Sequence, residues 1–358
     1  MKQSKKILIA NRGVIAIRAL RAARELGYSV ASVYSTIDRD QKHLKLSDEA
    51  ICIGPPETKD SYLNEAAIIS AAELSGADAI YPGFGFLAEN ASFAEKCRES
   101  GFKFIGPDPE VIAIMGDKIK AKELAKSLNI PVVPGYEGEI STENEAIKIV
   151  EEIGYPVIIK ASAGGGGRGM RVVNSSDELW QSIQSAQNEA ELAFGDGKIF
   201  IEKYLKKPRH IEVQIFGNGK GEAVHLFTRD CSLQRKYQKI VEEAPALNID
   251  NQKLEEIQNL SVEACKKLNY EGAGTIEFLY ENNDFYFIEM NTRIQVEHTV
   301  TEMITGVDLV QAQLLLALEN KYDFKQEDLK VNGHAMQCRI NAEDPETFVP
   351  SPGRIERV

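Results

Sequence analysis

The stretch Phe287–His298 constrains this chain most, because its polar residues fall at every second position. They are Glu289, Asn291, Arg293, Gln295 and Glu297. A period of two is the period of a β-strand, so an extended chain carries all five side chains on one face. An ordinary exposed strand alternates in the same way, but Asn and Gln are poor strand formers. The order of side chains therefore favours a site with a metal ion at the first pair, an oxyanion at Arg293 and a base at Glu297.

The segment just before this stretch predicts a β-hairpin. Gly274–Tyr280 has the pattern of a strand, and Glu281–Asp284 is a cluster of turn residues. An odd hairpin loop places Glu277 and Glu289 on one face, where the two carboxylates repel unless a cation lies between them. We therefore predict an odd loop and a divalent metal ion held by Glu277, Glu289 and Asn291, and an even loop would remove this site.

The first third of the chain predicts a separate domain. Residues 6 to about 114 alternate strand and helix patterns, which indicates a βαβ domain with a mostly parallel sheet. The turn Asn11-Arg12-Gly13 lacks the G-x-G-x-x-G pattern of a dinucleotide site. The loop Tyr81–Asn90 follows a predicted strand, at the edge where open α/β sheets bind ligands. Glycines that serve a tight turn explain the same loop equally well.

Two lysines stand where a nucleotide could bind. Lys118 follows the N-cap candidate Asp117 in the first turn of a predicted helix, and it opposes the helix dipole, which hints at a bound anion. Lys160 ends a predicted strand, and a run of glycines separates it from the next strand at 171–173. This is a hairpin with a long tip, without the G-K-[ST] of a Walker A motif. Because glycine backbone can approach phosphates closely, the pattern favours a nucleotide lid over a flexible surface loop.

Several other stretches have two interpretations. The strand 198–205 contains Glu202-Lys203 and could offer backbone groups to an adenine, while a lone His such as His210 is usually structural. The polar run Arg229–Glu243 could be a solvated loop, and Cys231 within it is predicted to be a packed thiol. Further predicted elements are helices over 143–153, 252–268 and 307–318 and a strand over 333–342 that carries Arg339.

Composition limits the class of protein. With 358 residues, 43% of them hydrophobic, the chain can form a large core in roughly two or three domains. The net charge of -12 argues against nucleic acid or an anionic membrane as partner. The five cysteines are scattered and lack metal-ligand spacing, which predicts reduced thiols in a cytoplasmic protein. No apolar run is long enough to span a bilayer.

Taken together, the motifs resemble the biotin carboxylase family of the ATP-grasp superfamily. They are Asn11-Arg12-Gly13, Gly83–Asn90, Gly164–Met170, Arg229–Ser232 and Glu289–His298. The resemblance covers essentially the whole chain and implies an α/β fold (α+β ATP-grasp). It implies a Rossmann-like parallel-sheet domain at 1–114, an antiparallel-sheet ATP-grasp domain at 115–330 with a glycine lid at about 133–205, and an incomplete C-terminal domain at 331–358. The family continues past this point, so we expect either a fragment or a naturally short chain.

The resemblance also implies an activity, the ATP-dependent carboxylation of biotin with bicarbonate through carboxyphosphate. Glu297 is the expected general base on bicarbonate, and Arg339 is expected to stabilise an enolate-like oxygen of biotin. The implied catalytic residues are Lys239, Arg293, Glu297 and Arg339, the bicarbonate residues Lys239, Arg293, Gln295 and Val296, and the biotin residues Phe84 and Arg339. The implied ATP residues are Lys118, Lys160, Gly166, Gly167, Glu202, Lys203, Tyr204, Leu205, His210, Gln234, Tyr237, Glu277 and Glu289. A pair of Mg²⁺ or Mn²⁺ ions is expected on Glu277, Glu289 and Asn291.

The implied partners follow from the same family. They are a biotin carboxyl carrier protein or domain, a carboxyltransferase component and, with a complete C-terminal domain, a second copy of the chain. The chain has no Met-Lys-Met biotinylation site, so biotin must arrive on another domain or protein. Acetyl-CoA carboxylase, and hence malonyl-CoA and fatty acid synthesis, is the favoured assignment, with pyruvate, propionyl-CoA or other biotin-dependent carboxylases as alternatives. Two further alternatives are a catalytically silent nucleotide-binding partner and an ATP-grasp ligase without biotin dependence, such as half of a carbamoyl-phosphate synthetase.

Four positions depart from the usual pattern of the family. Tyr237 replaces a His that contacts the nucleotide, and Tyr can donate a hydrogen bond but carries no positive charge. Phe84 replaces a Tyr near the biotin pocket and lacks its hydroxyl. Val14 and Thr299 replace a Glu and a Pro. None of these changes removes an expected metal ligand, the base or an essential Arg.

Overall fold

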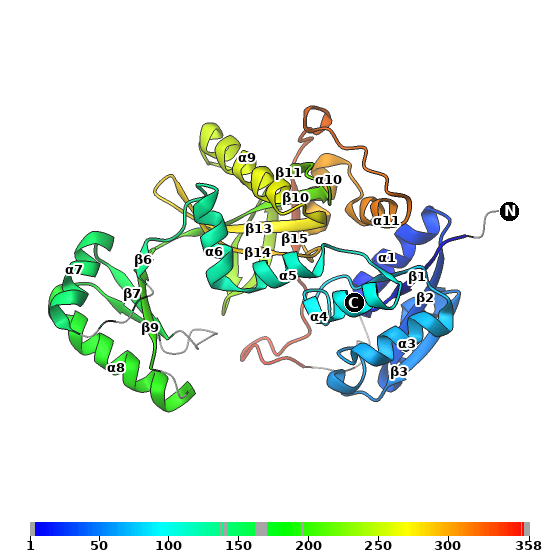
Figure 1. The fold of residues 1–358 in the computed structure, drawn as a ribbon, viewed down its shortest axis with the longest axis horizontal. Coiled ribbons are helices and arrows are strands. Elements are labelled where there is room, and N and C mark those ends of the chain that lie inside the picture. Colours follow the sequence, from blue (N-terminus) through cyan, green and yellow to red (C-terminus); the bar gives the residue numbers. More distant parts are fainter. Residues whose placement is uncertain are drawn as a thin grey trace. The chain divides into compact units, whose positions relative to one another are not determined.

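The computed structural model describes residues 4–136, 138, 140, 142–161, 170–194, 197–351 and 353. The chain forms two compact units (Figure 1). The first unit comprises residues 1–130, 209–279 and 289–358, and the second comprises 131–208 and 280–288. The mixture of parallel and antiparallel sheets with helices confirms the expected α/β class.

A five-stranded parallel sheet opens the first unit, as the alternating pattern predicts. Its strands stand in the order β3-β2-β1-β4-β5, and the strand order therefore reverses at β1. Their bounds are β1 Lys6–Ile9, β2 Ser29–Ser35, β3 Glu49–Gly54, β4 Ala79–Tyr81 and β5 Lys103–Phe104. Because β1 pairs in parallel with β4, the loops that follow these two strands begin at the same edge of the sheet, the place where open sheets bind ligands.

Helices bury both faces of this sheet. Ile7 and Ile9 belong to one core cluster, and Leu8 between them belongs to another. The helices are α1 Gly13–Glu25, α2 Lys42–Leu46, α3 Glu65–Ser75, α4 Ala91–Glu99, α5 Pro109–Gly116 and α6 Lys118–Ser127, with the 3₁₀ turns η1 Thr36–Asp38 and η2 Thr58–Asp60. The predicted N-cap is confirmed, because Asp117 accepts hydrogen bonds from the backbone N–H of Ile119 and Lys120.

A six-stranded sheet has the order β14-β13-β10-β11-β12-β15 and belongs to the first unit except for residues 280–288 of the β13–β14 hairpin. Its bounds are β10 Arg209–Asn218, β11 Ala223–Arg235, β12 Gln238–Ala244, β13 Glu271–Glu281, β14 Asp284–Asn291 and β15 Ala335–Cys338. The polar run Arg229–Glu243 is therefore two antiparallel strands and not a solvated loop. The turn between them places Lys236 and Tyr237 at φ 51° and 63°, a combination that suits a tight hairpin. Helices α9 Asn251–Lys267, α10 His298–Thr305 and α11 Leu309–Glu319 and the turn η3 Gln326–Asp328 complete the unit.

The hairpin of β13 and β14 closes with two residues, so the prediction of an odd loop is wrong. β13 ends at Glu281 and β14 begins at Asp284. The two residues between them, Asn282 and Asn283, have φ values of 54° and 69°. Asn tolerates positive φ better than most residues, and this allows the tight two-residue turn that the pattern did not anticipate.

The stretch Phe287–His298 is a strand only as far as Asn291. Residues 292–297 form a bend, an irregular pair of residues and a turn, and α10 begins at His298. The prediction that all five polar side chains share one strand face is therefore wrong for Arg293, Gln295 and Glu297. The chain leaves the sheet here because the next residues form a helix whose apolar side, with Val300 and Ile304, packs on Ala244 of β12.

The second unit is a four-stranded antiparallel sheet in the order β6-β9-β7-β8, with two helices beside it (Figure 1). Its elements are β6 Gly135–Tyr136, α7 Glu143–Ile153, β7 Val157–Ala161, β8 Arg171–Val173, α8 Ser176–Phe194 and β9 Ile199–Lys203. The antiparallel pairing of β7 with β8 confirms the predicted hairpin. Its glycine-rich tip, which includes Gly166 and Gly167, lies outside the described residues.

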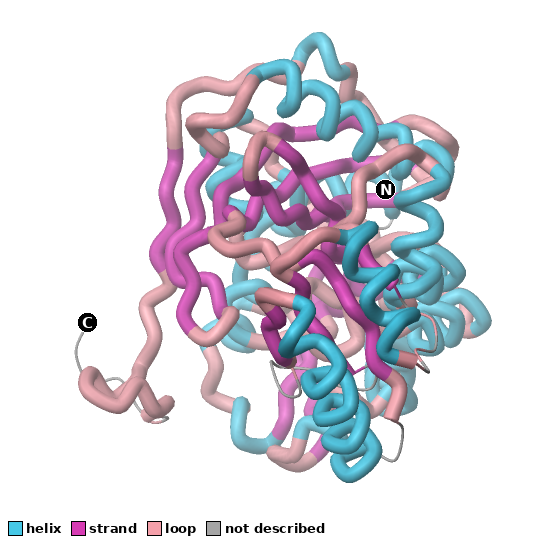
Figure 2. The backbone as a smooth tube through the Cα atoms, turned by 90° about the vertical axis from the view of Figure 1, so that its left-hand side faces the viewer, coloured by secondary structure: helices cyan, strands magenta, loops and turns pink. Residues whose placement is uncertain are grey.

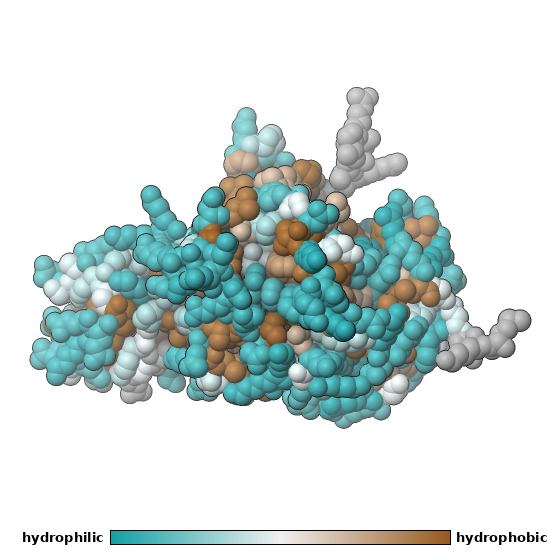
Figure 3. All heavy atoms as spheres, turned by 90° about the horizontal axis from the view of Figure 1, so that it is seen from above, coloured by the Kyte–Doolittle hydropathy of each residue, from teal (hydrophilic) through white to brown (hydrophobic). Residues whose placement is uncertain are grey.

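In the described part of the chain, no single helix is long and apolar enough to cross a membrane. The helices α10 and α11 pass this test only as a pair bent by 92°, and Leu309, Val310 and Leu314 of α11 lie in the core. On the face drawn in Figure 3, hydrophobic residues form small patches among mostly hydrophilic ones. β15 forms an edge of its sheet, and the chain continues beyond it as loops and turns (Figure 2).

Candidate active site

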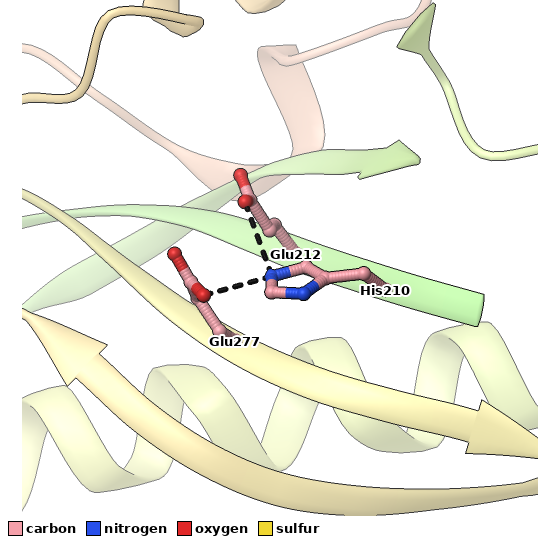
Figure 4. A group of neighbouring side chains, drawn as sticks. All are labelled: His210, Glu212 and Glu277. Carbon is pink, nitrogen blue, oxygen red and sulfur yellow. Dashed lines mark ion pairs between the residues drawn. The ribbon is translucent and has the colours of Figure 1, made fainter. Parts of the chain in front are cut away.

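Charged side chains from neighbouring strands meet on one face of the six-stranded sheet. His210 and Glu212 are two residues apart on β10 and therefore share a face, and Glu277 comes from β13 next to it. His210 Nε2 lies 2.8 Å from Glu277 Oε2 and 3.5 Å from Glu212 Oε1 (Figure 4). Burial by itself lowers the pKa of His210, but the two carboxylates outweigh burial and raise that pKa to about 9. The imidazole is therefore a cation in this site at neutral pH.

Lys239 of β12 connects three carboxylates. Its Nζ donates to Glu277 Oε1 at 2.9 Å and to Glu297 Oε1 at 2.8 Å, and it also donates to Glu212 Oε1. Burial lowers the pKa of Lys239, but the charges on Glu212, Glu277 and Glu297 more than offset this and raise it. Lys239 is consequently held as a cation at the centre of the site, the position in which an anionic substrate would meet it.

Arg229 lies beneath this group and is completely buried. Its guanidinium donates to Glu212 Oε2 at 2.9 Å, Gln214 Oε1 at 2.6 Å, Thr301 Oγ1 at 2.9 Å, Thr275 Oγ1 at 3.0 Å and Gln295 Oε1 at 2.7 Å. A buried guanidinium needs such partners, because its desolvation is costly. Because Arg only donates, Gln295 Oε1 must face it, and Gln295 Nε2 then donates to Glu277 Oε1 at 2.7 Å. Arg229 thereby sets the direction of the Gln295 amide.

Glu297 stands at the start of α10 but makes no capping hydrogen bond with its side chain. Its Oε1 accepts from Lys239, and its Oε2 accepts from Arg339 Nη2 at 3.0 Å. Arg339 follows β15 directly, and its backbone N–H donates to Ile240 O at 2.8 Å. The expected base and two expected catalytic cations therefore lie together, although they come from three separate parts of the sequence.

Arg293 is held by two neighbours. Its Nε donates to Glu89 Oε2 at 2.7 Å, and its Nη2 donates to Asn291 Oδ1 at 2.7 Å. Glu89 belongs to the glycine loop after β4, and its other oxygen accepts from the backbone N–H of Thr292 at 3.2 Å. The loop of the parallel-sheet region therefore reaches the turn that carries Arg293.

Two of the three predicted metal ligands, Glu277 and Asn291, are in contact despite the even hairpin loop. Asn291 Nδ2 donates to Glu277 Oε1 at 2.8 Å. Counting residues from the turn therefore does not decide which side chains meet at the far end of this hairpin. Burial raises the pKa of Glu289, and so does the negative charge of Glu277, whereas Lys118 acts in the opposite direction. Two carboxylates and an amide are ligand types that suit Mg²⁺ or Mn²⁺, and the Asn291 amide oxygen, which accepts from Arg293 Nη2 at 2.7 Å, would have to turn toward the ion.

Two groups of three residues each bring three possible metal-ligand atoms within 4.8 Å of one another. They are His210, Glu212 and Glu277 (Figure 4), and Glu212, Cys231 and Glu297. Both groups already lie against Lys239 or Arg229, whose charges neutralise the carboxylates. Cys231 is fully buried, as the packed-thiol prediction requires, and burial raises its pKa. All five cysteines of the chain are free thiols.

The second unit holds its own share of the expected nucleotide residues. Lys160 Nζ lies 2.6 Å from Glu202 Oε2, a pair formed across the antiparallel strands β7 and β9. Lys203 Nζ donates to the backbone oxygens of Gly154 at 2.8 Å and Tyr155 at 2.9 Å. The expected residues Tyr204 and Leu205 follow β9 and are half-buried. Lys160 and Glu202 are thus already paired at the end of the strand that precedes the glycine tip.

The remaining expected residues lie in the first unit. Lys118 is exposed at the start of α6, and Val296 is half-buried in the turn before α10. Gln234 Nε2 donates to Cys231 O at 2.9 Å, and the Tyr237 side chain at the β11–β12 turn is 78% exposed. Phe84 packs against the core, and its backbone oxygen accepts from Asn11 Nδ2 at 2.8 Å.

Glu89, Glu212, Arg229 and Glu242 contact the predicted site residues, but sequence reasoning did not assign them a role. Glu212 had a usable signal, because His210, Glu212 and Gln214 alternate along β10 in the same way as the residues of the metal hairpin. The others had none, since their partners are distant in sequence: Arg229 contacts Gln295, and Glu242 contacts Arg339.

Comparison with known proteins shows what this chain is similar to. Residues 3–112 match the family described as "Biotin carboxylase, N-terminal domain", and residues 117–325 match "Carbamoyl-phosphate synthase L chain, ATP binding domain". The biotin carboxylase of Haemophilus influenzae is 57% identical over 99% of this chain and 79% of its own length. A pyruvate carboxylase subunit of Methanothermobacter thermautotrophicus is 51% identical over 98% of this chain and 72% of its own length.

Solved structures give the same result. The biotin carboxylase domain dimer of the Hydrogenobacter thermophilus 2-oxoglutarate carboxylase was solved with MgADP, ADP and bicarbonate. It is 49% identical to this chain, with a TM-score of 0.87 over 100% of this chain and 79% of that one. The similarity therefore extends through both units.

Proposed function

Because the chain belongs to the biotin carboxylase family, we propose that it carboxylates carrier-bound biotin with bicarbonate and ATP. It is an ATP-dependent ligase with an ATP-grasp fold, and it binds ATP. The single observation that carries the proposal is the group around Lys239, where Glu297 lies 2.8 Å from one cation and 3.0 Å from a second, Arg339. That group combines a base with positive charges that can hold small anions.

The first step takes place on bicarbonate. Lys239, Arg293, Gln295 and the backbone of Val296 hold the anion, and Glu297 accepts its proton. The bicarbonate oxygen then attacks the γ-phosphate of ATP, which yields carboxyphosphate and ADP. The contact of the Gln295 amide oxygen with buried Arg229 supports this role, because it turns the amide nitrogen, which also donates to Glu277, away from Arg229 and toward an anion in the site.

The residues proposed to contact ATP are Lys118, Lys160, Gly166, Gly167, Glu202, Lys203, Tyr204, Leu205, His210, Gln234, Tyr237, Glu277 and Glu289. Mg²⁺ or Mn²⁺ on Glu277, Glu289 and Asn291 would neutralise the triphosphate charge. Burial and, after it, the negative charge of Glu277 raise the pKa of Glu289, and this supports the assignment because a bound cation would offset both effects.

The second step takes place on biotin. Carboxyphosphate breaks down to carbon dioxide and phosphate, and phosphate removes the N1′ proton of biotin. Arg339 stabilises the enolate-like oxygen of biotin, and Phe84 contacts its ring. The exposed fraction of the Arg339 side chain, 27%, supports this role because it leaves the guanidinium open to a substrate.

The assembly of this protein follows from its relatives. We propose a biotin carboxyl carrier protein or domain and a carboxyltransferase component as partners, and a homodimer like the one solved for the Hydrogenobacter relative. We favour acetyl-CoA, and hence fatty acid synthesis, as the final destination of the carboxyl group. Relatives named pyruvate carboxylase and 2-oxoglutarate carboxylase are nearly as similar, so either keto acid is the alternative acceptor. The three-domain division and a cytoplasmic location stay predictions.

One assay tests the proposal. ATP hydrolysis by the purified chain is measured with and without bicarbonate and with and without free biotin. We expect hydrolysis that requires bicarbonate and rises with biotin. Hydrolysis that is indifferent to biotin would contradict the assignment and favour another ATP-grasp ligase. Nucleotide binding without any hydrolysis would favour the catalytically silent alternative.

A further inference from the structure

Glu242 of β12 is a buried carboxylate that the proposed reaction does not use. The residue is 0% exposed, and its Oε1 accepts from Arg339 Nε at 2.5 Å. Its other oxygen is also buried and has no hydrogen-bond partner among the described residues. Buried carboxylate oxygens normally have partners, because an unsatisfied one costs free energy. A residue kept in such a position calls for an explanation.

The electrostatics of Glu242 are unfavourable as well. Burial raises its pKa, and the charges of Glu297 and Glu212 act in the same direction, while Arg339 acts against them. An apolar residue of similar size would remove this cost, since a buried ion pair contributes little net stability. A contribution to the stability of β12 therefore does not explain why position 242 is a carboxylate. The contact of Glu242 with Arg339 is the explanation that remains.

The contacts of Arg339 show what Glu242 does. The guanidinium donates through Nε to Glu242 and through Nη2 to Glu297 Oε2. Arg and a carboxylate prefer to pair through two parallel hydrogen bonds. With Nε occupied by Glu242, Arg339 cannot use it to bind both oxygens of Glu297. The remaining N–H groups of the Arg339 side chain have no protein partner within the described ranges, so they can donate to a substrate.

We propose that Glu242 is a positioning residue for Arg339. It fixes the guanidinium through Nε, keeps that N–H from the base Glu297 and leaves the remaining N–H groups for the oxygen of biotin. This inference rests on the proposed function, because it assigns Glu242 to the biotin step of that reaction. Glu242 itself touches neither substrate nor the reacting atoms.

A double-mutant cycle tests the inference. E242Q, R339M and the double variant are compared in biotin-stimulated ATP hydrolysis. We expect E242Q to lower kcat about tenfold, the effect of losing one charged hydrogen bond, with a smaller change in the KM for biotin. When R339M is already present, E242Q should change kcat by less than about twofold, because the guanidinium that Glu242 holds is absent.

The matched control is E243Q, which removes a carboxylate from the next position of the same strand. Glu243 pairs with His334 at 3.2 Å and does not contact Arg339. E243Q should retain wild-type kcat, and the thermal unfolding midpoint and the KM for ATP of E242Q should match the wild type, which separates positioning from a general loss of folding.

Four outcomes would count against the inference. Equal effects of E242Q with and without R339M, or no effect of E242Q, would overturn it while leaving the proposed function intact. If E242Q loses kcat and also has a lower unfolding midpoint and an altered KM for ATP that explain this loss, Glu242 has a structural role instead. A wild-type chain that biotin does not stimulate would overturn the proposed function, and this inference with it.

Discussion

Arg293 and Glu89 are 204 positions apart in the chain, yet Arg293 Nε donates to Glu89 Oε2 at 2.7 Å. The loop that carries Glu89 is itself fixed, because Asn11 Nδ2 donates to Pro82 O at 2.7 Å and to Phe84 O at 2.8 Å. Gly83 has a φ of 66°, and a Cβ there would lie 2.8 Å from Ile15 Cγ1, so only glycine fits. The glycine loop thus makes a tight turn and also positions a residue that holds Arg293.

Replacement of Glu89 by Gln should weaken bicarbonate binding. The change removes the charged partner of Arg293, so the neutral acceptors Asn291 Oδ1 and Ile294 O hold its guanidinium more weakly. Because the Glu89 side chain is 41% exposed, the effect should be modest, a rise of about fivefold in the KM for bicarbonate. E95Q is the control, since Glu95 also pairs with an Arg but on the exposed side of α4. An unchanged or lower KM in E89Q would refute the positioning role.

Replacement of Glu297 by Gln should abolish turnover and leave nucleotide binding largely intact. The amide keeps the shape of the side chain but cannot accept the proton of bicarbonate, so ATP hydrolysis should fall by about 100-fold or more. Calorimetric titration with ATP measures binding, and a coupled assay measures hydrolysis. Turnover near the wild-type rate would show that another group is the base.

Stability should depend on the charge of His210. The pKa of His210 is raised from 6.5 to about 9 in the folded chain, so its contribution is complete below pH 6.5 and is lost as the pH rises through 9. This amounts to at most about 3 kcal/mol of unfolding free energy. We expect the wild-type free energy of unfolding in urea to fall over this window, and H210N to flatten the decline. An equal decline in both proteins would show that other groups cause it.

Replacement of Glu212 by Gln should destabilise the fold strongly. Glu212 is completely buried, and it is the carboxylate that pairs directly with buried Arg229. Leaving that guanidinium without its counterion should cost about 3 kcal/mol in urea unfolding. The double variant E212Q/R229M should recover part of the loss, because it removes the unpaired charge as well. A loss below about 1 kcal/mol in E212Q would mean that the neighbouring carboxylates suffice.

Metal dependence should reside in the β13–β14 hairpin. EDTA should abolish ATP hydrolysis, and added Mg²⁺ or Mn²⁺ should restore it. E289Q should raise the metal concentration for half-maximal activity about tenfold, because a neutral amide is a weaker ligand for a hard cation. E281Q, at the far end of the same hairpin, should not change it. Equal metal requirements in E289Q and the wild type would place the ion elsewhere.

The local predictions succeeded where neighbours in sequence decide the structure. The parallel sheet, the Asp117 cap and the β7–β8 hairpin follow from periodicity and from side chains within a few residues. The prediction of a five-residue strand face failed after Asn291, because the packing of α10 on Ala244 turns the chain there. The prediction of an odd loop failed because two consecutive Asn residues allow a tighter turn.

The sequence by itself determined the kinds of chemistry available: the acid–amide pair at Glu289 and Asn291, the base Glu297, and the family to which these motifs belong. The tertiary structure alone decided how they meet. Lys239 reaches carboxylates from two other strands and a turn, while Arg229 fixes Gln295 from below. The physical reason is charge compensation. A buried charged side chain needs counterions close to it in space, and the fold can bring these from any position in the sequence.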